Sequence, residues 1–370
     1  MSLKKMISLF AVFALILVMT AGCGGSAPAS SAPAPAPSTD TPATSSEAAP
    51  PATKPWDEIT GDIMIYTSIY PDIIEILTPI IEENFPKLNV EWFQGGTGTV
   101  MGKMAAEIDS KTIGCDLLMV ADPSYNITLK NQNLLHPYKS IHHDAINGKD
   151  PEGYWYSVRR CNMIIAYNTE KTKVEDIPHT WKELAEDPRF KDKIGMPDPS
   201  KSGTATVAAG ALSDKYGWEY FDKLAANGMV VEAGNSAIQD KLLTGEYVAG
   251  MILEENILKL RELNNEPLAV YYPDDGTIGV PSAICTINTS KNLEACEALT
   301  DFFLSPEGQD AFISGWMHSV RNDFTKAPFD AKPTAEIEKN VMEVDWQNLS
   351  DNGELIKEKF RAALIDNAAK

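Results

Sequence analysis

Two neighbouring tyrosines, Tyr271 and Tyr272, open the segment YYPDDGT. A pair of phenolate oxygens could hold a ferric ion, which prefers hard anionic oxygen ligands, and a strand that runs into a turn could carry the same residues. Because successive side chains of a strand point to opposite faces, only one of the two hydroxyls can face a given ligand. We expect strand packing with one ligand-facing hydroxyl, that of Tyr272, and a ferric-iron site is the alternative interpretation.

Short segments rich in Ser, Thr, Gly and Asn stand where helices are expected to begin. Backbone N–H groups at a helix start carry partial positive charge, so together with hydroxyls they can bind a phosphate or phosphonate. The same side chains cap helices in proteins that bind nothing, and capping is the competing interpretation. The candidate anion ligands are Thr67 and Ser68; Gly96, Thr97 and Gly98; Ser200, Ser202, Gly203 and Thr204; and Asn235 and Ser236.

Two consecutive carboxylates, Glu254 and Glu255, follow the apolar run YVAGMIL. In a ligand site a carboxylate favours an ammonium group, as in 2-aminoethylphosphonate, or accepts hydrogen bonds from sugar hydroxyls. Only one of two consecutive residues can easily point inward, and a solvated helix start is the alternative. Arg159 and Arg160 are adjacent, and one of them could reach the anion or form an internal salt bridge.

Alternating strand and helix patterns must position these residues. Residues 62–66, 88–95 and 115–122 have the apolar content of strands, and the segments between them have apolar residues at helical spacing. This order predicts a parallel sheet with crossover helices, in which ligands collect at the carboxyl ends of the strands. The pattern recurs from Lys193 to Glu255. Residues 292–313 predict one amphipathic helix, and the tail predicts helices with a break at residues 351–353.

The first 57 residues differ from the rest of the chain. A basic start, an apolar run and small residues before Cys23 predict a signal peptide over residues 1–22, and this site resembles the lipobox of bacterial lipoproteins, with Cys23 lipidated. Residues 23–57 are almost entirely Ala, Pro, Ser and Thr, so we expect a disordered tether. The sequence therefore predicts an extracytoplasmic protein that is anchored to the cell membrane.

Composition and spacing exclude several classes. The 32 basic and 52 acidic residues give a net charge of −20, which repels nucleic acid. No nucleophile elbow, zinc spacing or phosphate-binding loop favours an enzyme, and we expect no metal ligands and no cofactor. The remaining cysteines are expected to be small buried side chains, and a bridge between Cys285 and Cys296 stays open.

Longer segments are recognisable. IYTSIYPD, PHTWKELAEDPRFKDKIGMPDPSKSGT, LLTGEYVAGMILEEN and YYPDDGTIGVPSAICTI resemble successive parts of type II solute-binding proteins of ABC importers. The resemblance spans residues 60–330 and is closest to the branch that holds ferric-iron, 2-aminoethylphosphonate and sugar-phosphate binders. It implies an α/β, two-lobed periplasmic-binding-protein (venus-flytrap) fold with two crossing hinge strands. One lobe would hold residues 58–157 and 275–325, and the other residues 158–274 and 326–370.

The resemblance also bears on the ligand. Iron-binding members of this branch carry a tyrosine pair just after the strand YVAGMIL, where this chain has Glu254 and Glu255, and a histidine after the first strand, where it has Ser68 to Tyr70. It therefore implies a component of an ABC importer that closes on a phosphonate- or phosphate-bearing solute and delivers it to a membrane permease. A monomer is the default expectation. A ferric-iron importer is the alternative.

Overall fold

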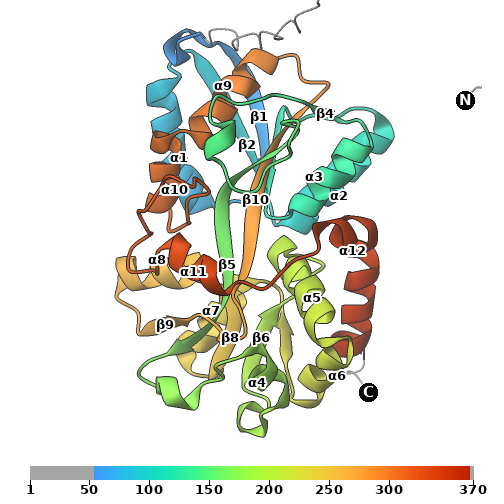
Figure 1. Ribbon diagram of the computed structural model, residues 1–370, viewed down its shortest axis with the longest axis vertical. Coiled ribbons are helices and arrows are strands. Elements are labelled where there is room, and N and C mark those ends of the chain that lie inside the picture. The colour runs from blue at the N-terminus through green and yellow to red at the C-terminus, as the bar shows by residue number, and fades with distance from the viewer. Residues whose placement is uncertain (1–53, 367–370) are drawn as a thin grey trace, which may run out of the picture. The chain divides into compact units, whose positions relative to one another are not determined.

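Strands and helices alternate over residues 61–131 and, apart from one pair of consecutive helices, over residues 194–271, as the apolar spacing predicts (Figure 1). The structure, a computed structural model, describes residues 54–366, which belong to one compact unit. The predicted signal peptide (1–22), Cys23 and residues 23–53 of the predicted tether lie outside the described residues. The last residues of that predicted tether enter the fold, because Trp56 stacks on Phe85 with ring centroids 5.5 Å apart.

Ten strands and twelve α-helices make up the regular structure of residues 54–366. The strands are β1 (Gly61–Thr67), β2 (Leu88–Gln94), β3 (Leu117–Val120), β4 (Leu135–His136), β5 (Tyr156–Asn168), β6 (Ile194–Pro197), β7 (Val230–Glu232), β8 (Ala249–Leu253), β9 (Leu268–Tyr271) and β10 (Ile278–Ile287). The α-helices are α1 (Pro71–Asn84), α2 (Thr97–Ser110), α3 (Pro123–Asn131), α4 (Trp181–Glu186), α5 (Gly203–Tyr216), α6 (Glu219–Ala226), α7 (Asn235–Thr244), α8 (Glu254–Asn264), α9 (Leu293–Leu304), α10 (Pro306–Ser314), α11 (Thr334–Ile337) and α12 (Trp346–Arg361). Short 3-10 turns cover Trp56–Glu58, His143–Ala145, Val174–Asp176, Pro188–Phe190 and Glu338–Asn340, and a π-helical turn covers Ala362–Asp366.

Buried apolar side chains form separate cores at the two ends of the sheet. Residues from 59–158 and 284–320 pack α1, α2, α3, α9 and α10 against β1 and β3. Residues from 161–280 and 342–364 pack α4 to α8 and α12 against β6 and β8. We call the parts around the first and second set lobe 1 and lobe 2. Both lobes lie within the one compact unit, and the predicted ends of each lobe stay a prediction.

One mixed sheet runs through both lobes in the order β2-β1-β3-β10-β5-β8-β6-β7, with β4 on β10 and β9 on β5. Strands β1, β2 and β3 are parallel, and so are β6, β7 and β8. β5 and β10 are antiparallel to each other and to their other neighbours. The expectation of a parallel sheet therefore holds within each lobe. The antiparallel strands β5 and β10 carry the chain out to lobe 2 and back.

The two long strands β5 and β10 cross between the lobes, as the fold implied by the resemblance requires (Figure 1). On β10, Ser282 pairs with Arg159 and Ala283 pairs with Ser157, so Val158 on β5 is an extra residue. Such a β-bulge bends its strand and redirects the neighbouring side chains. The bulge lies next to Arg159, which lines the cavity described below.

Residues 292–313 form two helices, α9 and α10, where the apolar spacing predicts one. Ser305 accepts a hydrogen bond from the N–H of Gly308 and so caps the second helix. Pro306, at its first position, has no N–H to continue the first helix. The single-helix prediction is wrong because apolar spacing continues across this junction while the backbone does not.

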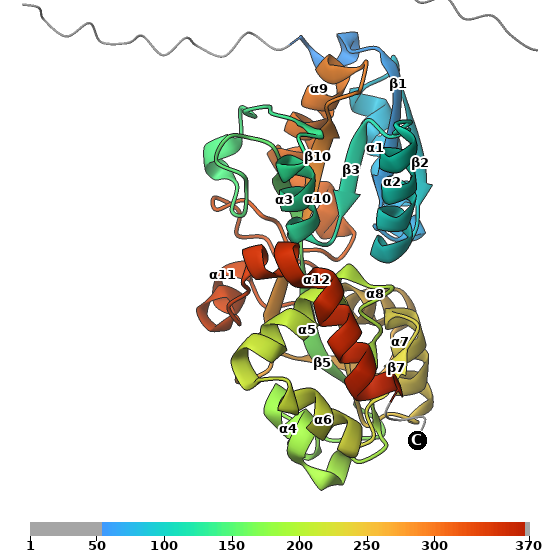
Figure 2. The same cartoon turned by 90° about the vertical axis from the view of Figure 1, so that its right-hand side faces the viewer.

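The predicted break at residues 351–353 does not occur, since α12 runs from Trp346 to Arg361. Its buried face, which includes Leu349 and Ile356, packs in the core of lobe 2. Figure 2 shows α12 passing in front of α5 and reaching towards α3 of lobe 1. Tertiary packing of this face outweighs the low helix propensity of Gly353, which costs roughly 1 kcal/mol relative to alanine.

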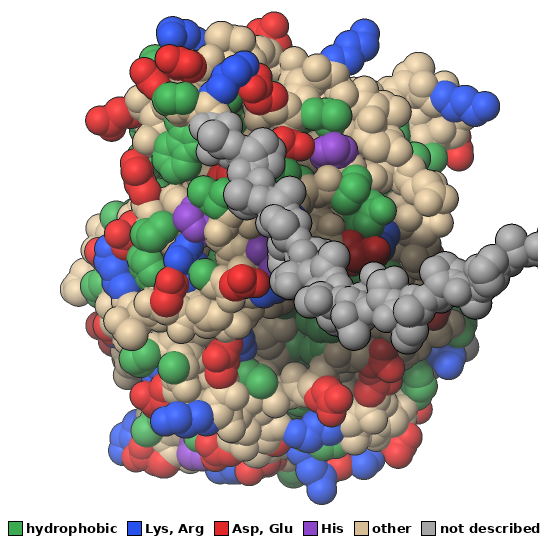
Figure 3. Space-filling view, turned by 45° about the horizontal axis from the view of Figure 1, so that its top comes forward, with side chains coloured by type: hydrophobic (Ala, Val, Ile, Leu, Met, Phe, Trp, Pro, Cys, Tyr) green, Lys and Arg blue, Asp and Glu red, His purple; other side chains and the backbone are tan. Residues whose placement is uncertain are grey.

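The described cysteines are four buried free thiols, Cys115, Cys161, Cys285 and Cys296, so the bridge left open for the last two is not formed. Among residues 54–366, no helix combines the length and apolar content of a membrane span. On the face in Figure 3, acidic and basic side chains are interspersed over both lobes. The charge inside a cavity must therefore be judged from its own residues.

Candidate functional site

A cavity of about 440 Å³ lies between lobe 1 and lobe 2, at the carboxyl ends of their strands. Segments that follow β1, β2 and β3 line it from lobe 1, and segments that follow β6, β7 and β8 line it from lobe 2. The predicted residues that line it are Ser68, Gly96, Thr97, Ser202, Gly203, Thr204, Asn235, Ser236 and Glu255. The structure thus brings predicted helix starts of both lobes to one cavity.

Helices α2, α5, α7 and α8 begin at this cavity. Gly96 precedes α2 and Gly234 precedes α7, and neither start receives a capping side-chain hydrogen bond within the described part of the chain. Ser202 does cap α5, because it accepts the N–H of Ala205 at 3.3 Å. First-turn N–H groups have no partner inside their own helix. The uncapped starts of α2 and α7 therefore offer donors to an anion from opposite lobes.

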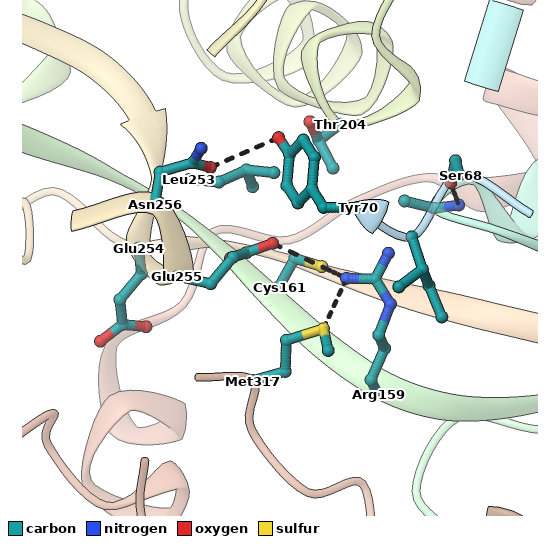
Figure 4. A network of polar contacts seen from close by, with 12 residues as sticks. Ser68, Tyr70, Arg159, Cys161, Thr204, Leu253, Glu254, Glu255, Asn256 and Met317 are labelled. Carbon is teal, nitrogen blue, oxygen red and sulfur yellow. Dashed lines mark hydrogen bonds and ion pairs between the residues drawn. The ribbon is translucent and has the colours of Figure 1, made fainter. Parts of the chain in front are cut away.

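Arg159 and Glu255 form a buried ion pair at the cavity, with side chains 3% and 4% exposed. Glu255 Oε1 lies 3.6 Å from Arg159 Nη1, which is longer than a hydrogen bond. Nη1 donates instead to Cys161 Sγ at 2.7 Å and Met317 Sδ at 2.9 Å (Figure 4). Arg159 Nε and Glu255 Oε1 have no hydrogen-bond partner among residues 54–366. Both charged groups therefore retain hydrogen-bonding capacity beside the cavity.

The ionisation of Glu255 depends on this pairing. Burial raises the pKa of the Glu255 carboxyl, and the Arg159 guanidinium opposes that rise. A second cation beside Oε1 would oppose it further. The carboxylate is thus held less firmly in its charged form than an exposed one, and a cationic group of a ligand would stabilise it.

Tyr70 joins the lobes across one side of the cavity. It precedes α1 in lobe 1, and its hydroxyl donates to Asn256 Oδ1 (Figure 4) and accepts from Asn235 Nδ2, each at 3.3 Å. Burial, with the charge of Glu255, raises the pKa of the Tyr70 hydroxyl. The neutral phenol therefore acts as a polar contact between the lobes.

Other predicted ligands lie outside the cavity. Thr67 is fully buried behind it, where Oγ1 donates to Met119 O at 3.0 Å and accepts from Ile69 N at 3.1 Å. Gly98 and Ser200 face each other where the lobes touch, since a Cβ built on Gly98 would clash with the carbonyl oxygen of Ser200. Thr67, Gly98 and Ser200 therefore pack around the cavity, but they do not line it.

Glu254 and Tyr272 also lie away from the cavity. Glu254 points to the opposite side from Glu255 (Figure 4), so one of the two carboxylates faces inward. Its Oε2 accepts from Asn162 Nδ2 at 2.7 Å and lies 3.0 Å from His318 Nε2, and its Oε1 accepts from the Tyr272 hydroxyl. Burial and the charge of Glu254 raise the pKa of Tyr272. These side chains form a polar cluster beside the crossing strands.

The two neighbouring tyrosines have different partners. The Tyr271 ring stacks on His179 with centroids 4.7 Å apart, and its hydroxyl donates to Asp274 Oδ1 at 3.1 Å. Tyr272 contacts Glu254. Neither tyrosine lines the cavity, and within residues 54–366 no three or more His, Cys, Asp or Glu side chains gather as a metal site.

Sequence reasoning missed three polar residues of the lining, namely Tyr70, Gln94 and Lys201. Gln94 ends β2, so the rule that ligands collect at strand ends could have found it. Lys201 lies within the predicted turn between Ser200 and Ser202. Tyr70 lies between β1 and α1, so the same rule indicates its segment, but its contacts between the lobes depend on residues more than 160 positions away.

Comparison with known proteins identifies the family. Residues 113–352 match the family model described as bacterial extracellular solute-binding protein. A probable ABC transporter periplasmic-binding protein of Sinorhizobium fredii is 21% identical over 275 residues, which cover 70% of this chain and 75% of that protein.

Two solved structures share the fold. Iron-bound HitA from Pseudomonas aeruginosa has a TM-score of 0.72 at 18% identity, over 81% of this chain and 99% of HitA. AfuA from Actinobacillus pleuropneumoniae, with exogenous fructose-6-phosphate bound, has a TM-score of 0.72 at 22% identity, over 82% of this chain and 98% of AfuA. These similarities show the type II periplasmic-binding-protein fold, and the family match assigns a solute-binding role rather than an enzymatic one. The chain belongs to the family of bacterial extracellular solute-binding proteins.

Proposed function

We propose that this protein is the lipid-anchored solute-binding component of an ABC importer and that it captures a small phosphonate- or phosphate-bearing solute between its lobes. The observation that carries the proposal is the convergence of helix starts from both lobes on a cavity that also holds Arg159 and Glu255. The volume of about 440 Å³ suits a small organic molecule better than a bare ion. The predicted lipidation of Cys23 would keep the protein beside its permease.

The anionic end of the solute would lie between α2 and α7. Uncapped N–H groups at both helix starts and the hydroxyls of Thr97 and Ser236 are suitable donors for phosphate oxygens. Lys201 adds positive charge to the lining, whereas the charge of Arg159 lies beside Glu255. These donors come from both lobes, so an anion would contact all of them only when the lobes are closed.

The other end of the solute would lie at Glu255. Its Oε1 is buried and lacks a hydrogen-bond partner among the described residues, which suits an ammonium or hydroxyl group. A zwitterion such as 2-aminoethylphosphonate would place its ammonium there and its phosphonate at the helix starts. A sugar phosphate would place a hydroxyl at the same oxygen.

Ferric iron is the second candidate solute, because HitA, which shares this fold, is iron-bound. The lining offers one phenol, Tyr70, and one carboxylate, Glu255, as anionic oxygen donors to such an ion. A pair of neighbouring phenolates is not available there, since Tyr271 and Tyr272 lie outside the cavity. We therefore rank iron second.

A thermal-shift panel tests the proposal with 2-aminoethylphosphonate, ethylphosphonate, glucose 6-phosphate, inorganic phosphate and ferric citrate. A solute that binds only the folded state raises Tm by several degrees at saturating concentration. We expect an organic phosphonate or phosphate to do so and ferric citrate to have no effect. A rise with ferric citrate alone, together with a visible tyrosinate–iron absorption band, would favour the iron importer.

A pair of variants then locates the site. Glu255→Gln removes the buried carboxylate, and Asp240→Asn removes the same charge from an exposed position on α7. The first variant should lose the preference for 2-aminoethylphosphonate over ethylphosphonate, and the second should keep it. Equal behaviour of the two variants would place the solute elsewhere.

A further inference from the structure

The two lobes meet backbone to backbone beside the cavity, at glycines. A Cβ on Gly98, in the first turn of α2, would lie well under 3.0 Å from the carbonyl oxygen of Ser200 in lobe 2. A Cβ on Gly96 would lie 3.0 Å from the carbonyl oxygen of Lys201. Backbone atoms cannot rotate away as a side chain can, so a methyl group at Gly98 would force the lobes apart.

Gly203 makes the reciprocal contact from lobe 2. A Cβ at this first residue of α5 would lie 2.7 Å from Ala121 O and 2.8 Å from Thr97 Cγ2, both in lobe 1. Each lobe thus presents a glycine to the other lobe's backbone.

Polar contacts between the lobes surround this interface. Tyr70 reaches Asn235 and Asn256, and Lys259 Nζ lies 2.8 Å from Asp72 Oδ2. On α3 and α12, the hydroxyls of Thr128 and Ser350 lie 2.9 Å apart. The structure therefore describes a closed arrangement of the lobes.

We infer that Gly98 and Gly203 are positioning residues for lobe closure, whose lack of a side chain lets the lobes come close enough to complete the solute site. This inference rests on the proposed function in one respect, that solute binding requires the closed arrangement. It gives Gly98 a role other than the direct ligand contact expected from its place at a helix start.

The local backbone does not require glycine at position 98. Gly98 lies inside α2 and is absent from the residues with positive φ, so alanine fits its conformation and favours the helix. Gly102, one turn later in the same helix, has nothing within 4 Å of a built Cβ. Gly98→Ala and Gly102→Ala are therefore matched substitutions that differ in the contact with lobe 2.

Affinity is the first readout. In calorimetric titrations of the full-length chain with whichever phosphonate or phosphate probe binds it, Gly98→Ala should weaken binding on the order of tenfold to a hundredfold, the range expected for an overpacked contact. Gly102→Ala should bind as the unaltered chain does. Urea unfolding without solute should show neither variant to be less stable. Unchanged affinity in Gly98→Ala would overturn the inference.

A crosslink gives a second readout that needs no solute. In a Thr128→Cys and Ser350→Cys background, a disulfide forms only when α3 and α12 meet, as they do in the closed arrangement. Under oxidised glutathione, Gly98→Ala should slow this crosslink on the order of tenfold or more, and Gly102→Ala should leave its rate unchanged.

The two readouts separate the two proposals. If none of the probes binds the unaltered chain, the proposed function fails, and the crosslinking rates still decide the role of Gly98. Equal crosslinking rates in the Gly98→Ala and Gly102→Ala backgrounds, or no crosslink without the glycine substitutions, would overturn the inference about closure.

Discussion

At the scale of single residues, the Arg159 and Glu255 pair combines burial with incomplete hydrogen bonding. Removing one member of a buried pair leaves an uncompensated charge and typically costs 3–5 kcal/mol, about the range we expect for Arg159→Met or Glu255→Gln. The double variant should lose much less than the sum of both losses. Urea unfolding of the three variants measures this coupling, and additive losses would show that the two charges act independently.

The pH dependence of binding follows from the raised pKa of Glu255. A ligand ammonium would stabilise the carboxylate and lower that pKa in the complex, so binding should release a proton. Affinity for 2-aminoethylphosphonate should be full above the raised pKa and fall as the pH drops through it. Calorimetry in buffers of different ionisation enthalpy measures the released proton.

Ethylphosphonate serves as the reference because it has no ammonium. An ammonium lowers the pKa of the neighbouring phosphonate, so the protons that each phosphonate itself exchanges are measured on the free ligands and subtracted. Glu255→Gln should remove the difference between the two ligands. Identical proton release for both ligands with the unaltered chain would contradict the placement of the ammonium at Glu255.

The helix-start rule predicted much of the lining at this scale, including Ser68, Thr97 and Ser236. It also predicted Thr67, whose hydroxyl bonds to the backbone instead, because burial is not visible in the sequence. The sequence could not decide which of Glu254 and Glu255 points into the cavity, because this depends on which face of α8 lies towards it.

At the scale of elements, the serines at the starts of α5 and α7 differ in whether they cap their helix. Ser202 caps α5, so Ser202→Ala should lower the free energy of unfolding by about 1 kcal/mol. Ser236 lines the cavity but does not cap α7, so Ser236→Ala should leave stability unchanged and weaken solute binding. Urea unfolding and calorimetry on both variants test this; a stability loss in Ser236→Ala would assign it a capping role.

Element order could be predicted from apolar spacing, whereas some boundaries could not. The junction at Ser305 and Pro306 interrupts a continuous apolar pattern, and α12 continues through Gly353 because its apolar face packs in lobe 2. Both outcomes depend on capping and tertiary contacts that outweigh local spacing.

At the scale of the whole molecule, the two lobes were predictable from the repeated strand and helix pattern, but their closed arrangement was not. It depends on contacts between distant segments, such as Gly98 with Ser200 and Tyr70 with Asn256.

Tyr70→Phe tests the polar part of that arrangement, since it removes the hydroxyl shared with Asn235 and Asn256. Losing contacts worth about 1 kcal/mol should weaken solute binding roughly fivefold. Tyr125→Phe, in lobe 1 and outside the lining, is the control. Calorimetry that gives equal affinities for both variants would remove Tyr70 from the closure contacts.

One cavity, we propose, binds a phosphorus-containing solute between helix starts of both lobes. A crystal structure of the protein grown with 2-aminoethylphosphonate tests it most directly. We expect phosphonate density within hydrogen-bond distance of the first turns of α2 and α7, with the ammonium at Glu255. Ligand density outside this cavity, or a metal ion held by Tyr271 and Tyr272 after growth with ferric citrate, would contradict it.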